Sequence, residues 1–268
     1  MSLLSALLAL GGSLWLSACS EPRVVVGELK CPLNEGGAAG RNEDGSFNSG
    51  PLPAPWETSF EDSFCGYERD AGFCYADPGS GYRLVTSPVR TGPFAAAFEL
   101  ALNGEEVPHQ ARCVREGVLP DAAYYGAWFY IPSGSSDPNN WNLVHFQGGT
   151  PGDRQLAGMW DVNVRQDDSG MLALYVADTR PLPHDYVQED PVPLPTDRWF
   201  HLEFYLKRAA DETGEIALFQ DDEELLRVSE IVTDDNELVQ WYVGNFANAI
   251  TPAESTLYVD DVSIRLER

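Results

Sequence analysis

Apolar and polar residues alternate along most of the chain after about residue 56. The clearest run lies in 199–207, where from Phe200 onward large apolar side chains take the even positions and His, Glu, Tyr and Lys the odd positions. A second run, 159–165, alternates in the same way. A period of two residues is typical of a β-strand with one buried face.

Further strands are predicted where β-branched and aromatic residues gather between turn residues. These segments are 124–131, 142–147, 171–176, 215–220, 238–246 and 257–266. No window of helical period competes with them. Many short strands separated by Gly, Pro and Asp turns predict an all-β fold, an antiparallel β-sandwich.

Residues 20–55 are rich in Gly and Pro and show neither period, which predicts an arm rather than a packed element. We therefore expect three parts. Residues 1–18 form a signal peptide, 19–55 a flexible tether, and 56–268 one β-sandwich domain.

Small residues precede Cys19 directly after an apolar, Leu-rich run, in the order Leu16-Ser17-Ala18-Cys19. This segment resembles the lipobox of bacterial lipoprotein signal peptides, although Met1 to Leu4 carry no basic residue. The resemblance implies lipidation of Cys19 and a place in the bacterial cell envelope, as an outer membrane or cell-surface lipoprotein. The alternative is a plain secretory signal cut elsewhere. The apolar run is shorter than a membrane-spanning helix requires, so we expect membrane contact through the lipid anchor alone.

The chain is strongly acidic, with 42 Asp and Glu against 17 Lys and Arg and a formal net charge of −25. Such a surface repels phosphate backbones, which excludes nucleic acid as a partner.

Beyond Cys19 the chain has cysteines at 31, 65, 74 and 113. An even number in an exported protein favours disulfides, and four cysteines permit three pairings. We expect Cys65–Cys74 to close a polar loop and Cys31–Cys113 to hold the N-terminal arm. The spacings match no zinc motif.

Four segments resemble the concanavalin A-like jelly roll. They are Ser59 to Asp62, Pro195 to Glu203, Glu215 to Glu223 and Tyr258 to Ile264, and they span nearly all of the predicted domain. Their order is most similar to that of polysaccharide lyases of the heparin lyase and glucuronan lyase type.

In that lyase type, an early strand carries an Arg, a middle strand a Gln and His pair, and a late strand a Gly-x-Tyr motif. The matching residues are Arg112, the pair His145 and Gln147 in reversed order, and Gly244 to Phe246. The resemblance implies catalytic roles for Arg112, His145 and Gln147. Phe246 stands where the lyases have a tyrosine hydroxyl, and Tyr125, Tyr175 or Tyr205 are candidates to replace it.

His145 and Gln147 are two residues apart on a predicted strand, so they project to one face. Asp161, Asn163 and Arg165 share a face of another strand in the same way. With Tyr175 and Trp141, these side chains suit carbohydrate binding, because aromatic rings stack on pyranoses and amides bind hydroxyls. The alternative is an ordinary solvated sheet face.

Jelly rolls of this type often hold a structural Ca²⁺ where the first and last strands meet, which points to Glu61 and Asp260. Carboxylates are the hard oxygen ligands that Ca²⁺ requires. An exposed carboxylate pair is the alternative, and we expect no other cofactor.

The combined prediction is a surface-anchored lipoprotein that recognises a polysaccharide and resembles polysaccharide lyases, with β-elimination on uronate polymers as its candidate activity. Two alternatives stay open at this point. One is a non-catalytic carbohydrate-binding module, and the other is a structural or adhesive envelope protein.

Overall fold

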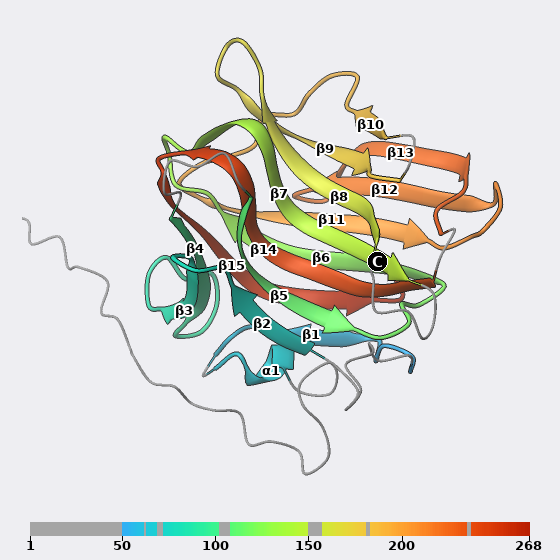
Figure 1. The fold of residues 1–268 in the computed structure, drawn as a ribbon, viewed down its shortest axis with the longest axis horizontal. Helices are drawn as coiled ribbons and strands as arrows, with labels where there is room; N and C mark the ends of the chain where they lie inside the picture. The colour runs from blue at the N-terminus through green and yellow to red at the C-terminus, as the bar shows by residue number, and fades with distance from the viewer. Residues whose placement is uncertain are drawn as a thin grey trace, which may run out of the picture.

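A computed structural model describes residues 50–61, 63–68, 72–101, 108–149, 157–180, 183–234 and 237–268. The described chain forms two antiparallel sheets that pack face to face (Figure 1). The predicted all-β sandwich is therefore confirmed. The signal peptide, Cys19 and Cys31 lie outside the described residues. Within them, no helix has the length and apolar character needed to cross a bilayer.

The eight-stranded sheet has the order β13-β12-β11-β6-β15-β4-β3, and β1 pairs with β15. Its strands are β1 (Trp56–Thr58), β3 (Gly81–Val85), β4 (Ala95–Ala101), β6 (Ala122–Tyr130), β11 (Trp199–Lys207), β12 (Gly214–Gln220), β13 (Glu223–Ile231) and β15 (Glu254–Arg265).

The seven-stranded sheet has the order β10-β9-β8-β7-β14-β5-β2. Its strands are β2 (Gly72–Ala76), β5 (His109–Glu116), β7 (Ser136–Gly149), β8 (Ala157–Gln166), β9 (Leu172–Asp178), β10 (His184–Val187) and β14 (Glu237–Thr251). The short helix α1 (Cys65–Glu68) precedes β2.

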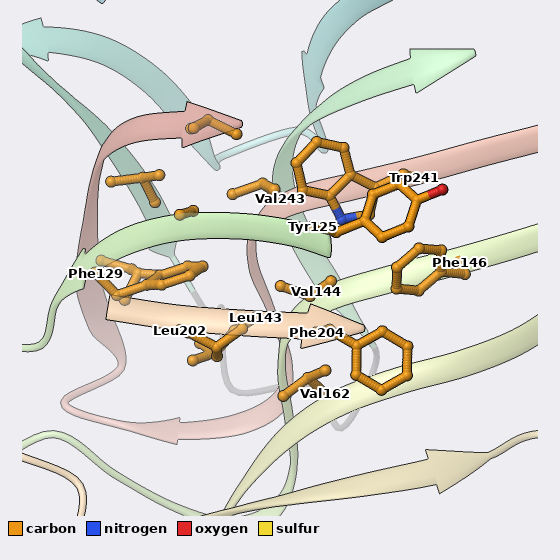
Figure 2. Packing of buried hydrophobic residues seen from close by; sticks show 14 of the residues in the cluster. Tyr125, Phe129, Leu143, Val144, Phe146, Val162, Leu202, Phe204, Trp241 and Val243 are labelled. Carbon is orange, nitrogen blue, oxygen red and sulfur yellow. The ribbon is translucent and has the colours of Figure 1, made fainter. Parts of the chain in front are cut away.

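The core lies between the sheets, where each strand turns its apolar face inward (Figure 2). Tyr125 of β6 contacts Phe146 of β7 and Trp241 of β14, with ring centroids 5.0 and 5.2 Å apart. Phe146 also packs on Phe204 of β11 at 5.3 Å. The alternation predicted for 199–207 and 159–165 is confirmed, because their even-numbered apolar residues are all in this core. Burial of this apolar surface is the main force that holds the sheets together.

Two central strands of the seven-stranded sheet, β7 and β14, are not regular. The register between them shifts between Val243 and Phe246, and the register between β7 and β8 shifts between Asn142 and Val144. Such β-bulges re-aim side chains and are common beside active sites. Here they change which residues of β7 face outward.

The predicted disulfide pairing is wrong. Cys74 is bonded to Cys113, not to Cys65, so the expected Cys31–Cys113 bridge is excluded as well. The cause is the pairing of β2 with β5, which places Cys74 directly opposite Cys113. Cys65 in α1 is also disulfide-bonded.

Packing begins slightly before the predicted domain boundary at residue 56. Leu52 is buried in the core, and Pro51 forms an isolated β-bridge with Val118. The last residues before β1 therefore belong to the folded domain.

Candidate functional site

The outward face of the seven-stranded sheet carries a cluster of polar side chains where β5, β14, β7 and β8 run side by side (Figure 1). Regular alternation puts the apolar residues of these strands into the core, so the residues between them point away from it. The cluster contains Arg112, Asn142, His145, Gln147, Asp161, Asn163 and Tyr242.

His145 and Asp161 are direct cross-strand neighbours on β7 and β8. The imidazole Nδ1 of His145 is in hydrogen-bonding contact with Oδ1 of Asp161. An ionised carboxylate can only accept, so we assign the ring proton to Nδ1. His145 Nε2 then carries the lone pair and is the atom able to take a proton from a ligand.

Asn142 links this pair to Arg112. Arg112 donates from Nη2 to Oδ1 of Asn142 over 2.7 Å. The amide nitrogen of Asn142 lies 2.9 Å from Oδ1 of Asp161 and 3.1 Å from Oδ1 of Asn163. The network therefore holds a guanidinium on β5, an amide on β7 and a carboxylate on β8 in fixed positions.

Tyr242 of β14 lies directly opposite His145. Its ring meets the imidazole edge-on, with centroids 5.1 Å apart. The hydroxyl lies 2.6 Å from Oε1 of Gln147 and also contacts Oε1 of Gln240. The Nε2 group of Gln240 is held by Glu116.

A phenol has one proton to donate, so it cannot satisfy both amide oxygens. The hydroxyl therefore donates to one of the two oxygens at a time, and Gln240 is itself held by Glu116. The two amides fix the Tyr242 hydroxyl on the same face as the imidazole of His145.

Phe246, the residue in the place of the expected tyrosine, supports the arginine. The guanidinium carbon of Arg112 lies 4.5 Å from the centroid of the Phe246 ring. Gly244 allows this approach, because a Cβ there would lie 2.4 Å from the carbonyl oxygen of Ala111. Its φ of +152° also favours glycine.

The central residues are strongly shielded from solvent. Arg112 is 5% exposed, Tyr242 6% and His145 9%. Burial lowers the pKa of the Arg112 guanidinium, while the nearby Tyr75 and Asp161 raise it in part. In a shielded site such charges act more strongly on a bound group than they do in water.

The structure brings together most of the residues that the sequence proposed for this site. Arg112, His145, Asp161 and Asn163 are joined by hydrogen bonds through Asn142. Gln147 is bonded to Tyr242, whose ring contacts His145. Two other predicted residues, Arg165 and Tyr175, lie on strands β8 and β9 of the same sheet. Arg165 is exposed beyond Asn163 on β8, and Tyr175 pairs with Asn163 on β9.

Trp141 does not lie on this face, which corrects its predicted place in a groove. It is 1% exposed, belongs to the core, and donates from Nε1 to Oδ1 of Asn245 over 2.9 Å. The bulge after Asn142 reverses the alternation, so Asn142 takes the outward position. Regular strand geometry would have put Trp141 and His145 on one face.

Two of the tyrosines considered as replacements lie elsewhere. Tyr125 is buried in the core, and Tyr205 belongs to β11 of the other sheet. Tyr242 and Asn142 are the site residues that the sequence reasoning missed. Tyr242 is four residues before Phe246 and shares its parity, which is the signal that could have identified it.

Glu61 and Asp260 lie near the eight-stranded sheet, away from the polar cluster. Glu61 and Asp261 line a cavity of about 740 Å³ there, together with Trp128 and His201. Asp260 accepts backbone N–H groups of Arg90, Thr91 and Asp261. Burial, followed by the charge of Asp261, raises the pKa of Asp260 to about 6. No group of three or more His, Cys, Asp or Glu within reach of one metal ion occurs among the described residues.

Comparisons with known proteins identify a family from the sequence and a fold from solved structures. The family model described as polysaccharide lyase matches residues 56–263. No curated protein sequence matches this chain.

Among solved structures, the chain resembles an endo-β-1,4-glucuronan lyase from the fungus Trichoderma reesei, with 16% identity and a TM-score of 0.56 over 81% of this chain and 93% of that one. The alginate lyase Aly36B has 12% identity and a TM-score of 0.55 over 81% and 98%. The cellulose-induced protein Cip1 has 16% identity and a TM-score of 0.57 over 79% and 97%. At these identities the likeness shows the fold.

Proposed function

Since the chain belongs to the polysaccharide lyase family, we propose that it cleaves a uronate-containing polysaccharide by β-elimination at the polar cluster of the seven-stranded sheet. The observation that carries this proposal is the convergence of Arg112, His145 and Tyr242, from three different strands, on one shielded site.

β-Elimination next to a uronate carboxylate needs three groups, and the cluster offers one of each. Arg112 neutralises the carboxylate, which makes the C5 proton acidic. Nε2 of His145 takes that proton while Asp161 holds the opposite nitrogen. The hydroxyl of Tyr242 supplies the proton that the leaving oxygen needs.

The step balances without any further reactant. The C5–H electrons form the C4=C5 double bond, and the bond between C4 and the glycosidic oxygen breaks. The leaving oxygen takes the proton of Tyr242, which becomes a phenolate. The proton on His145 and the one missing from Tyr242 equilibrate through solvent once the products leave.

The test is absorbance of the unsaturated uronate product, scanned over glucuronan, alginate, heparin and pectin. Turnover by the wild-type protein that is lost in His145→Ala supports the proposal. Glycan affinity without any unsaturated product would instead assign the protein as a carbohydrate-binding module. Neither product nor affinity would favour a structural role in the envelope.

We also propose that Cys19 is lipidated and that the protein is anchored to the bacterial cell envelope. The support is the sequence Leu16-Ser17-Ala18-Cys19 after an apolar run. In Cys19→Ala the protein should move from the membrane fraction to the soluble fraction. Unchanged partition into membranes would contradict the anchor.

A structural Ca²⁺ beside Glu61 and Asp260 is a separate proposal. The support is the donor type: Glu61 lines the cavity with Asp261, Asp260 is the buried residue before Asp261, and carboxylate oxygens are ligands that Ca²⁺ prefers. No three acidic side chains of the described residues are within reach of one ion, so backbone carbonyls would have to complete the coordination. These residues would hold the ion and tie β15 to the segment after β1. Chelation by EDTA should lower the melting temperature, and added Ca²⁺ should restore it. A melting temperature unaffected by both would rule the ion out.

A further inference from the structure

We propose that the substrate is a heteropolysaccharide in which single uronates stand between neutral sugars, rather than a polymer with a carboxylate on every residue. The inference rests on the β-elimination proposed above and adds the charge pattern of its substrate. It comes from the distribution of positive charge over the described part of the chain.

Most of the arginines that the structure describes are already neutralised by a carboxylate of the protein. Arg180 at the end of β9, for example, forms an ion pair with Asp178 and also donates to the carbonyl of Val232. The arginines paired in this way are Arg83, Arg90, Arg180, Arg198, Arg208, Arg227, Arg265 and Arg268.

On the outward face of the seven-stranded sheet, Arg112 and Arg165 form no ion pair with any described residue. Arg112 lies on β5 and Arg165 on β8, with β14 and β7 between them. Three interstrand steps of about 4.8 Å separate the two strands by roughly 14 Å. This gap is longer than one pyranose residue, so a chain lying across the strands has sugars between the two arginines.

The sugars between the arginines would meet the polar side chains of β14 and β7 instead of cations, namely Tyr242, His145 and Asn142. Asp161, with a side chain 15% exposed, borders this interval on β8 next to the amide of Asn163. Asp185, on the edge strand β10, adds a further exposed carboxylate on the same sheet. A uronate beside the reacting one would therefore be placed against like charge.

The net charge of the whole protein also repels a densely charged polyanion, since it is formally −25. Like-charge juxtaposition at a binding surface is a strong means of rejecting a partner. One carboxylate can be accepted by Arg112, whereas neutral neighbours can use the amides for their hydroxyls. The geometry thus fits a sparse charge pattern.

The experiment compares substrates that differ only in uronate density. Glucuronan, alginate and polygalacturonate are each assayed intact and after partial carboxyl reduction, which turns a fraction of their uronates into neutral sugars. Product is followed as unsaturated uronate, and kcat/KM is expressed per remaining uronate. We expect kcat/KM to rise by about tenfold or more in the reduced form of at least one polymer. Added salt should reduce the difference in kcat/KM between the intact and reduced polymers, because it screens the repulsion between uronates and protein carboxylates.

A charge-reversal variant tests the cause. Asp185→Lys should raise kcat/KM on an intact polyuronate more than on its reduced form. Glu223→Lys makes the same change at an exposed site of the other sheet and is the matched control. It should leave the ratio of kcat/KM on the intact polymer to kcat/KM on the reduced polymer unchanged.

The outcomes separate the two proposals. Higher kcat/KM on the intact polyuronate than on its reduced form would overturn the sparse-charge inference and leave β-elimination standing. No unsaturated product from any of the six substrates would overturn both. If Asp185→Lys and Glu223→Lys change the ratio of kcat/KM on intact and reduced polymer equally, the role assigned to the outward face of the seven-stranded sheet is contradicted.

Discussion

Asp161 holds His145 by the nitrogen that does not face the proposed substrate, because its Oδ1 contacts Nδ1 across the β7 and β8 pair. Nε2 has no partner among the described residues. This single contact defines the tautomer in which the imidazole can act as a base. Asp161 is therefore a positioning residue in the proposed reaction.

Asp161→Asn should lower kcat by about 10²–10⁴-fold, the usual range for loss of a general base, with little change in KM. The asparagine NH₂ would donate to Nδ1 and force the proton onto Nε2, which is the wrong tautomer. The acidic limb of the pH–rate profile, which reports the base, should also change in the residual activity. Asp185→Asn removes an exposed carboxylate from the same sheet and should keep the wild-type pH profile. A normal pH profile in Asp161→Asn would contradict the positioning role.

Tyr242→Phe should abolish elimination, since it removes the hydroxyl and keeps the ring against His145. The loss of hydrogen bonds to Gln147 and Gln240 should lower the free energy of unfolding by about 1–2 kcal/mol, so the variant should still fold. Turnover and urea denaturation measure the two effects. Phe246→Tyr, assayed in the Tyr242→Phe background, tests whether a hydroxyl at the other position can substitute. Full activity in Tyr242→Phe would exclude this tyrosine as the acid.

Replacing Cys74 and Cys113 together by serine should lower the free energy of unfolding by about 2–5 kcal/mol, the typical loss for a native bridge. The bridge joins strands β2 and β5 across a sequence separation of 39 residues. Thermal or urea unfolding measures the loss, and peptide mapping without reduction should find the Cys74–Cys113 link. A Cys65–Cys74 peptide in that map would contradict the structure.

In calcium-free buffer, Asp260 should make the protein less stable as the pH rises. Its folded pKa of about 6 lies above the unfolded value near 3.8, so the folded state holds the proton more tightly. Its stabilising contribution is complete below about pH 4 and is lost as the pH rises through about 6. The free energy of unfolding of wild type relative to Asp260→Asn should therefore fall between pH 4 and pH 7.

Asp197 gives the matched control with the opposite sign. Hydrogen bonds from Ser133 lower the pKa of Asp197, so its contribution is present at neutral pH and is lost as the pH falls. Relative to Asp197→Asn, wild type should gain stability as the pH rises. Equal slopes for the two variants would contradict the assignment for Asp260.

The alternation of apolar and polar residues is enough to predict the sandwich and much of its interior. Strict alternation at 199–207 and 159–165 fixed which side chains enter the core, because a strand that buries one face can do so in one register only. The same parity put His145 and Gln147 on the outward face. Arg112 was found through its resemblance to an arginine-bearing strand, and the structure places it beside them through Asn142.

The rest of the site and the disulfide depend on how distant strands pair in the folded chain. A bulge after Asn142 exchanged Trp141 for Asn142 on the outward face, and a bulge cannot be read from alternation. The neighbours β14 and β7 are far apart in sequence, so no local pattern showed that Tyr242 would face His145. Cys74 meets Cys113 for the same reason, since β2 pairs with β5 and not with the helix that carries Cys65. Strand order depends on how the apolar faces of all strands pack together. These contacts join residues far apart in sequence, so no local pattern specifies them.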